Sequence, residues 1–170
     1  MTSDSEFPRL FDVRQCEGKQ VRLEANEAER AALSERFGIV RIDRLVADLL
    51  LTRQDRDVDA SGKLVADIVQ ACAVSAEDLP VVIREEIGFR FVPEAEHHTS
   101  EEIELEPEDC DEIEYAGTHF DLGEAVAQSL ALAIDPFATG PEADTARRRP
   151  ELSGENNENA FAALKGLNLQ

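Results

Sequence analysis

The sequence contains no tryptophan and few aromatic residues or cysteines. Aromatic side chains make up only 5% of the 170 residues, so a hydrophobic core must be built mainly from Val, Leu, Ile and Ala. The three cysteines, Cys16, Cys72 and Cys110, are odd in number and form no Cys-x-x-Cys pair. This pattern argues against a disulfide framework and against a structural zinc site. We therefore expect free thiols in a reducing cytoplasm, and neither a metal nor a cofactor.

Basic residues and long apolar runs are also scarce. Lys and Arg number 17 against 37 Asp and Glu, which gives a formal net charge of -20. Such a chain repels nucleic-acid phosphates and attracts basic proteins. No apolar run approaches the roughly 18 residues that a membrane-spanning helix needs, and the first residues lack the features of a secretory signal. These absences predict a cytoplasmic protein without membrane contact.

Alternating and helical hydrophobic patterns together predict an α+β fold. Two helices are expected, at residues 27–37 and from residue 122 to about 134, each with one apolar stripe. We expect a mostly antiparallel twisted sheet that packs one face on both helices, and the sequence leaves open whether this sheet closes into a barrel. The expected strands are at 7–15, 19–25, 39–52, 63–74 and 80–93, with 53–62 as a hairpin connection.

Polar residues at the expected helix ends support both helices. Asn26 and Glu29 have the spacing of a capping box, and Gly38 follows the first helix as its stop. Asp121 and Glu124 repeat the capping-box spacing at the start of the second helix.

An acidic block interrupts the expected domain, which spans residues 1–136. Residues 94–114 carry eleven carboxylates and no Lys or Arg, so we expect a mobile insertion. One interpretation is a solubilising loop. The other is a mimic of nucleic-acid phosphates that holds a basic protein. Residues 137–170 are expected to form a flexible, disordered C-terminal tail whose short apolar segment, with Phe161 and Leu164, either docks on a partner or folds back on this chain.

No catalytic motif appears in the sequence. His97 and His98 lie in the acidic block, where a mobile backbone would not hold a catalytic group in place, and His119 is expected at the surface. The acidic block also lacks the spacing of an EF-hand calcium loop. Arg84 and Arg90 share the polar face of one expected strand, so they either contact RNA or pair with neighbouring carboxylates.

The order of these segments resembles the YceD-like large ribosomal RNA subunit accumulation proteins, and more closely their proteobacterial branch. The resemblance covers roughly residues 7–136, and residues 159–164 are similar to a tail segment of that branch. Many relatives carry a Cys-x-x-Cys where this chain has Cys72 and Ser75, so a metal role is not carried over. The segments that carry the resemblance are residues 29–33, 47–49, 70–75, 89–93, 121–124 and 130–136.

The resemblance implies a factor in large-subunit ribosomal RNA accumulation or processing, and no defined enzyme activity. Relatives are often encoded beside a small basic ribosomal protein, which implies a basic ribosomal protein or a large-subunit precursor as the partner. Two alternatives stay open: an acidic interaction module or nucleic-acid mimic unrelated to ribosomes, and an RNA enzyme with an unrecognised site. The candidate partner-binding residues are Glu101, Glu102, Glu104, Glu106, Phe161 and Leu164, and the candidate RNA contacts are Arg84 and Arg90.

Overall fold

The computed structural model describes residues 5–94 and 111–147, which divide into two units. The larger unit contains the described residues up to Val69 and from Pro80 to Ile134, and the smaller contains Gln70–Leu79 and the described residues from Asp135 onward. The elements are β1 (Leu10–Asp12), a 3-10 helix (Val13–Gln15), β2 (Lys19–Glu24), α1 (Glu27–Phe37), β3 (Arg41–Gln54), β4 (Asp57–Ala71), β5 (Asp78–Pro93), β6 (Asp111–Tyr115), β7 (His119–Asp121), α2 (Leu122–Ala133) and α3 (Ala143–Arg147).

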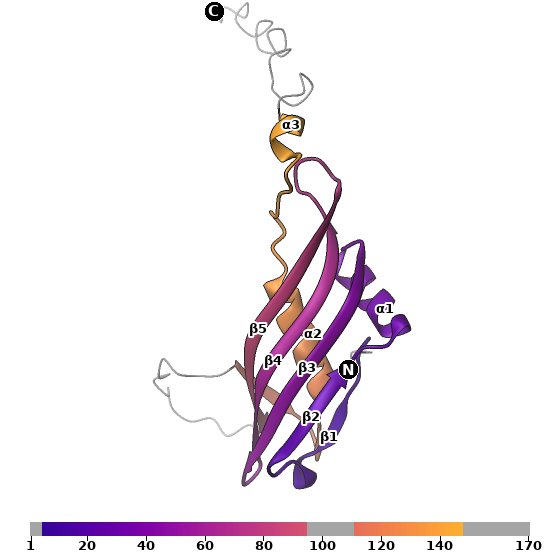
Figure 1. The fold of residues 1–170 in the computed structure, drawn as a ribbon. Helices are drawn as coiled ribbons and strands as arrows, with labels where there is room; N and C mark the ends of the chain where they lie inside the picture. The colour runs from indigo at the N-terminus through magenta and orange to yellow at the C-terminus, as the bar shows by residue number, and fades with distance from the viewer. Residues whose placement is uncertain (1–4, 95–110, 148–170) are drawn as a thin grey trace, which may run out of the picture. The chain divides into compact units, whose positions relative to one another are not determined.

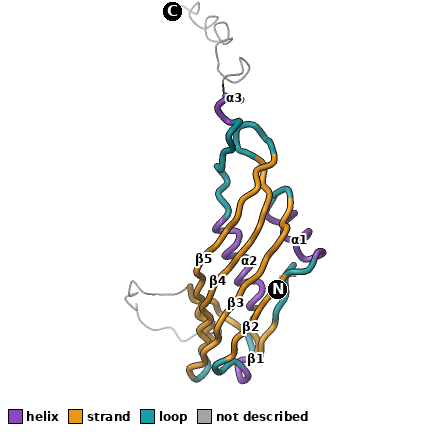
Figure 2. Tube along the Cα trace, viewed as in Figure 1, coloured by secondary structure: helices purple, strands orange, loops and turns teal. Residues whose placement is uncertain are grey.

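Five strands form one open sheet in the order β2-β3-β4-β5-β6 (Figures 1 and 2). The β2–β3 and β3–β4 pairs are antiparallel, and the β5–β6 pair is parallel. Because β2 and β6 are edge strands, this sheet does not close into a barrel. The short strands β1 and β7 form a separate antiparallel pair. The α+β class with a mostly antiparallel sheet is confirmed.

One face of the sheet is covered and the other is open. Side chains from α1 and α2 share a buried core with the inward-facing residues of β3 and β4. On β3, Leu49 and Leu51 are buried while Asp48, Leu50 and Thr52 between and beside them are exposed, which is the predicted alternation. In Figure 1, α2 runs behind the long strands, so the face toward the viewer is the open one.

The connection between β3 and β4 is shorter than predicted. Residues 53–62 were expected to form a polar hairpin connection, but only Asp55 and Arg56 form the turn, and β4 begins at Asp57. Asp55 has a φ of 58°, a value found in tight turns. The polar residues of this stretch alternate with buried Val58 and Ala60. They therefore belong to a strand whose outer face meets solvent.

The two predicted helices are present with their predicted N-caps. Asn26 and Glu29 form a reciprocal capping box on α1, and Gly38 ends the helix with a φ of 65°. On α2, the Asp121 side chain accepts a hydrogen bond from the Glu124 N–H at 3.1 Å. The Glu124 carboxylate pairs with Arg36 of α1 at 2.8 Å and so links the two helices. This ion pair, with a second hydrogen bond from Gln128, lowers the pKa of Glu124 below its usual range.

Three other segments differ from the sequence prediction. Residues 7–15 form only the short β1 and a 3-10 helix. The acidic stretch 94–114 contains β6 at its end, because Ile113 and Tyr115 pack on the core while Glu112 and Glu114 are exposed. Residues 143–147 of the expected tail form α3. The rest of both stretches, residues 95–110 and 148–170, lies outside the described residues.

Aromatic side chains pack together between the β1–β7 pair and the end of β5. Phe91 of β5 stacks on Phe120 of β7 with ring centroids 4.2 Å apart, and Phe120 also stacks on Phe11 of β1. The Tyr115 hydroxyl donates a hydrogen bond of 2.7 Å to the Arg56 carbonyl in the β3–β4 turn. Phe11, Phe91 and Phe120 therefore form an aromatic cluster between the two sheets, with Phe89 and Tyr115 beside it.

Candidate functional site

The predicted arginines lie on the open face of β5. Arg90 is half-buried and lies between two carboxylates of β4, 3.7 Å from Asp57 and 3.8 Å from Asp59. Arg84 is exposed and lines a shallow groove of about 250 Å³ with Lys63 and Glu86. Pairing with neighbouring carboxylates, one of the two sequence interpretations, therefore holds for Arg90.

Side chains of alternating charge cross the open face. Arg22 of β2 donates to both carboxylate oxygens of Asp48 on β3, at 3.0 and 2.9 Å. Asp48 is the register partner of Lys63 on β4, and Lys63 lies 3.9 Å from Glu86 on β5. These residues were not predicted as site residues from the sequence. The alternation within each strand places them on the polar face, but only the register brings them into one row.

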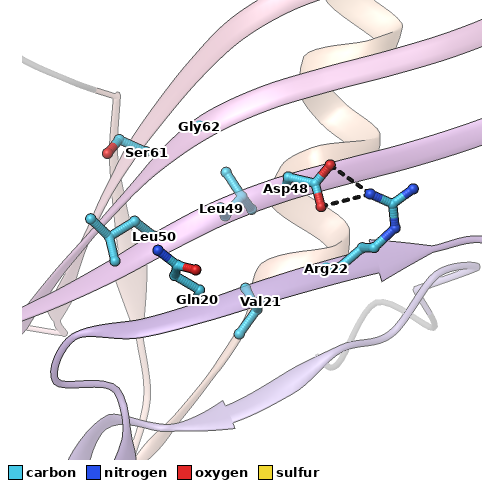
Figure 3. Close-up of a pocket in the computed structure, with 8 residues that line it drawn as sticks. All are labelled: Gln20, Val21, Arg22, Asp48, Leu49, Leu50, Ser61 and Gly62. Atoms are coloured by element: carbon cyan, nitrogen blue, oxygen red, sulfur yellow. Dashed lines mark hydrogen bonds and ion pairs between the residues drawn. The ribbon is translucent and has the colours of Figure 1, made fainter.

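A groove of about 430 Å³ lies beside this row (Figure 3). Arg22 and Asp48 point toward one another at one end, and Gln20, Leu50 and Ser61 lie at the other. Leu50 is 42% exposed and gives the groove an apolar contact point. Exposed ion pairs contribute only about 0–1 kcal/mol each. A ligand could therefore separate Arg22 from Asp48 at little cost.

The acidic segment begins and returns at one edge of the sheet. β5 ends at Pro93, and the chain comes back as the edge strand β6, parallel to β5, with Phe89 opposite Asp111 and Pro93 opposite Tyr115. The Glu94 N–H donates a hydrogen bond of 2.9 Å to the Tyr115 carbonyl. Both ends of the segment are thus fixed by the fold. The candidate residues Glu101, Glu102, Glu104 and Glu106 within it, and Phe161 and Leu164 in the tail, lie outside the described residues.

The described histidine and cysteines have local partners. His119 hydrogen-bonds Thr118 at 3.0 Å and lies 4.0 Å from Asp12, and its side chain is 54% exposed, as expected for a surface residue. Cys72 is buried in the smaller unit, where its pKa is lowered to about 6 by the Ser75 hydroxyl and by the N–H groups of Gly140, Ser75 and Val74. These donors also enclose the sulfur, which favours a structural role for this thiol.

Two negative findings apply to the described parts of the chain. Within residues 5–94 and 111–147, no group of three or more His, Cys, Asp or Glu side chains could hold a metal ion. None of the helices in the same ranges is long and apolar enough to cross a membrane.

The fold defines an α+β protein with one helix-covered and one open, charged sheet face. The family model of the large ribosomal RNA subunit accumulation protein YceD matches residues 60–168, which is more than half of the chain. The chain therefore belongs to this family, and the family name implies a role in the accumulation of large-subunit ribosomal RNA. The match begins within β4 and includes the acidic segment and most of the tail. No curated protein and no solved structure matches the chain.

Proposed function

We propose that this chain is a noncatalytic factor in large-subunit ribosomal RNA accumulation that binds a basic ribosomal protein, alone or in a ribonucleoprotein intermediate. The observation that carries the proposal is the anchoring of the acidic segment between β5 and β6. Residues 94–114 carry eleven carboxylates and no Lys or Arg, and the described ends of this stretch lie at one edge of the sheet. Family membership supplies the ribosomal context.

The charges around the segment support a basic partner. Glu112 and Glu114 on β6 and Glu94 at the end of β5 are exposed. The Cα partner of Glu112 is Arg90, but this arginine already lies near Asp57 and Asp59. It therefore does little to neutralise the segment. An uncompensated acidic surface steers basic proteins to it and speeds their association, and salt screens that attraction.

The open sheet face supports a protein partner more than naked RNA. Phosphate binding needs cations that are free to replace counterions. Arg22 is held by Asp48, and Lys63 lies beside Glu86. A row of alternating charges can pair with both the acidic and the basic groups of a protein surface. Its carboxylates, at every second position, repel the phosphates of RNA. Arg84 remains the best candidate for a single RNA contact.

A pull-down of the tagged protein from its own cells tests the partner. We expect a basic large-subunit ribosomal protein or a large-subunit precursor to be recovered at moderate salt and lost at high salt. Changing Glu101, Glu102, Glu104 and Glu106 together to Gln should lower recovery about 10-fold, taking each exposed charge pair as a few tenths of a kcal/mol.

The matched control removes four exposed carboxylates elsewhere. The control variant changes Glu24, Glu77, Glu85 and Glu142 to Gln, which are all exposed in the structure. It has the same net charge as the test variant and should retain normal recovery. Equal losses in both variants would assign the effect to net charge and contradict the segment mechanism. Recovery of partners that include no ribosomal protein would favour an acidic interaction module unrelated to ribosomes.

A further inference from the structure

Helix α1 and the start of β3 enclose a second groove, of about 500 Å³. Its apolar lining comes from Ala31 on the helix and from Ile39, Val40 and Ile42. Val40 is 46% exposed although it is a large aliphatic side chain, whereas Ile42 is only 5% exposed. Ile42 therefore gives the groove a buried apolar base, and Val40 gives it an apolar side that a ligand can reach.

The local backbone fixes the shape of this groove. Gly38, with its φ of 65°, reverses the chain after α1, and the Ile39 N–H donates a hydrogen bond of 3.1 Å to the Ser34 carbonyl. The Val40 N–H donates at 2.9 Å to Val69 at the end of β4. Because the facing helix residue is Ala31, a small side chain, space remains between helix and strand.

The charges on the helix side of the groove are acidic. Glu27 and Glu35 both line it and are exposed. They are eight positions apart, so their Cα atoms lie about 12 Å apart along the helix. Ala31 sits midway between them. The two basic residues of the lining are directed to local acceptors, since Arg30 donates to the Ala25 carbonyl at 2.7 Å and Arg41 to Asp43 at 2.9 Å.

We propose that this groove docks an extended basic segment of the protein partner, in which one aliphatic side chain lies between two cations. In an extended chain, residues i, i+2 and i+4 share one face, and i and i+4 are about 13 Å apart. A Lys-x-Leu-x-Lys sequence thus places its lysines opposite Glu27 and Glu35 and its leucine against Ala31 and Val40. This inference rests on the proposed function for the charge of the partner, but it uses a different surface.

Fluorescence anisotropy with a labelled Lys-Ala-Leu-Ala-Lys peptide tests the groove on the full chain. We expect saturable binding that Ala31→Leu weakens about 10-fold, because the added side chain takes the space of the peptide leucine. Glu27→Gln with Glu35→Gln should weaken binding about 5-fold. The same peptide with Glu in place of Lys should not bind. Ala31 is exposed, so the Ala31→Leu protein should unfold at the temperature of the unmodified chain.

The control protein changes Glu24 and Glu142 to Gln, which are exposed and outside the groove, and should bind the peptide normally. Any of three results would contradict the proposal that the groove binds a basic segment. These are no saturable binding up to about 1 mM peptide, an unchanged affinity of the Ala31→Leu protein, and an equal loss of affinity in the control protein. The four Gln changes of the acidic segment leave Glu27, Ala31 and Glu35 intact. A failure of the pull-down is therefore distinguishable from a failure of the groove.

Discussion

Gly123→Ala is expected to lower the free energy of unfolding by about 3 kcal/mol, the upper range for overpacking a tight site. Helix propensity alone predicts the opposite sign, because Ala is favoured over Gly by about 1 kcal/mol inside a helix. The structure decides between the two effects. A Cβ on Gly123 would overlap the Phe7 carbonyl oxygen and would press on the backbone of Arg9.

The N-terminal segment cannot easily move away from that Cβ. Phe7 is fully buried, and the Arg9 N–H donates to the Asp121 carboxylate at 2.8 Å. The Arg9 carbonyl accepts from the Leu122 N–H at 3.0 Å, and the Arg9 guanidinium pairs with Glu29 at 2.7 Å. Relieving the overlap would therefore break several contacts that hold residues 7–9 against α1 and the start of α2.

Urea denaturation of the full chain measures this effect, and Leu132→Ala on the same helix is the control. Leu132 is 83% exposed, so its truncation should change stability by no more than about 0.5 kcal/mol. Trypsin should also cut faster after Arg9 in the Gly123→Ala protein, because the segment detaches first. A Gly123→Ala protein as stable as the unmodified chain would show that the N-terminal segment does not pack here.

Gly62→Ala is expected to cost about 2–3 kcal/mol, again as an overpacked site. Gly62 faces Leu49 in the β3–β4 register, and a Cβ there would overlap the Asp48 carbonyl oxygen. The two strands would have to separate next to the groove of Figure 3. Ala normally stabilises a strand relative to Gly by limiting the unfolded chain, so a loss of stability reports the close approach of the strands.

Ser61→Ala is the control for Gly62→Ala. Ser61 is the adjacent residue of β4 and is exposed on the open face, so its change should be nearly neutral in thermal unfolding. If Gly62→Ala matches Ser61→Ala, the strands are farther apart than the structure shows.

Local sequence patterns predicted the helices better than the sheet. Asn26, Glu29 and Gly38 mark the ends of α1 because capping is decided within a few residues. The start of β4 was misjudged because Asp57 and Asp59 are polar, and only the open face of the sheet makes them strand residues. β6 was missed because Glu112 and Glu114 belong to the acidic block, whose charge predicted a mobile insertion although Ile113 and Tyr115 alternate with these glutamates.

The candidate surfaces depend on long-range register, which sequence spacing does not contain. Arg22, Asp48 and Lys63 come from three strands and form one row only because β3 pairs with both β2 and β4. Likewise, the requirement for Gly123 follows from contact with Phe7, more than 100 positions earlier in the chain. The acidic segment was visible in composition alone, because eleven carboxylates in residues 94–114 need no folding to be recognised.

Complementation in cells that lack this chain tests the role of the acidic segment most directly, with the ratio of large-subunit to small-subunit ribosomal RNA as the readout. The unmodified protein and the control with Glu24, Glu77, Glu85 and Glu142 changed to Gln should both restore the ratio. The protein with Glu101, Glu102, Glu104 and Glu106 changed to Gln should be present at the same level and fail to restore it. Full restoration by that protein would show that these four carboxylates are not needed for the accumulation of large-subunit ribosomal RNA.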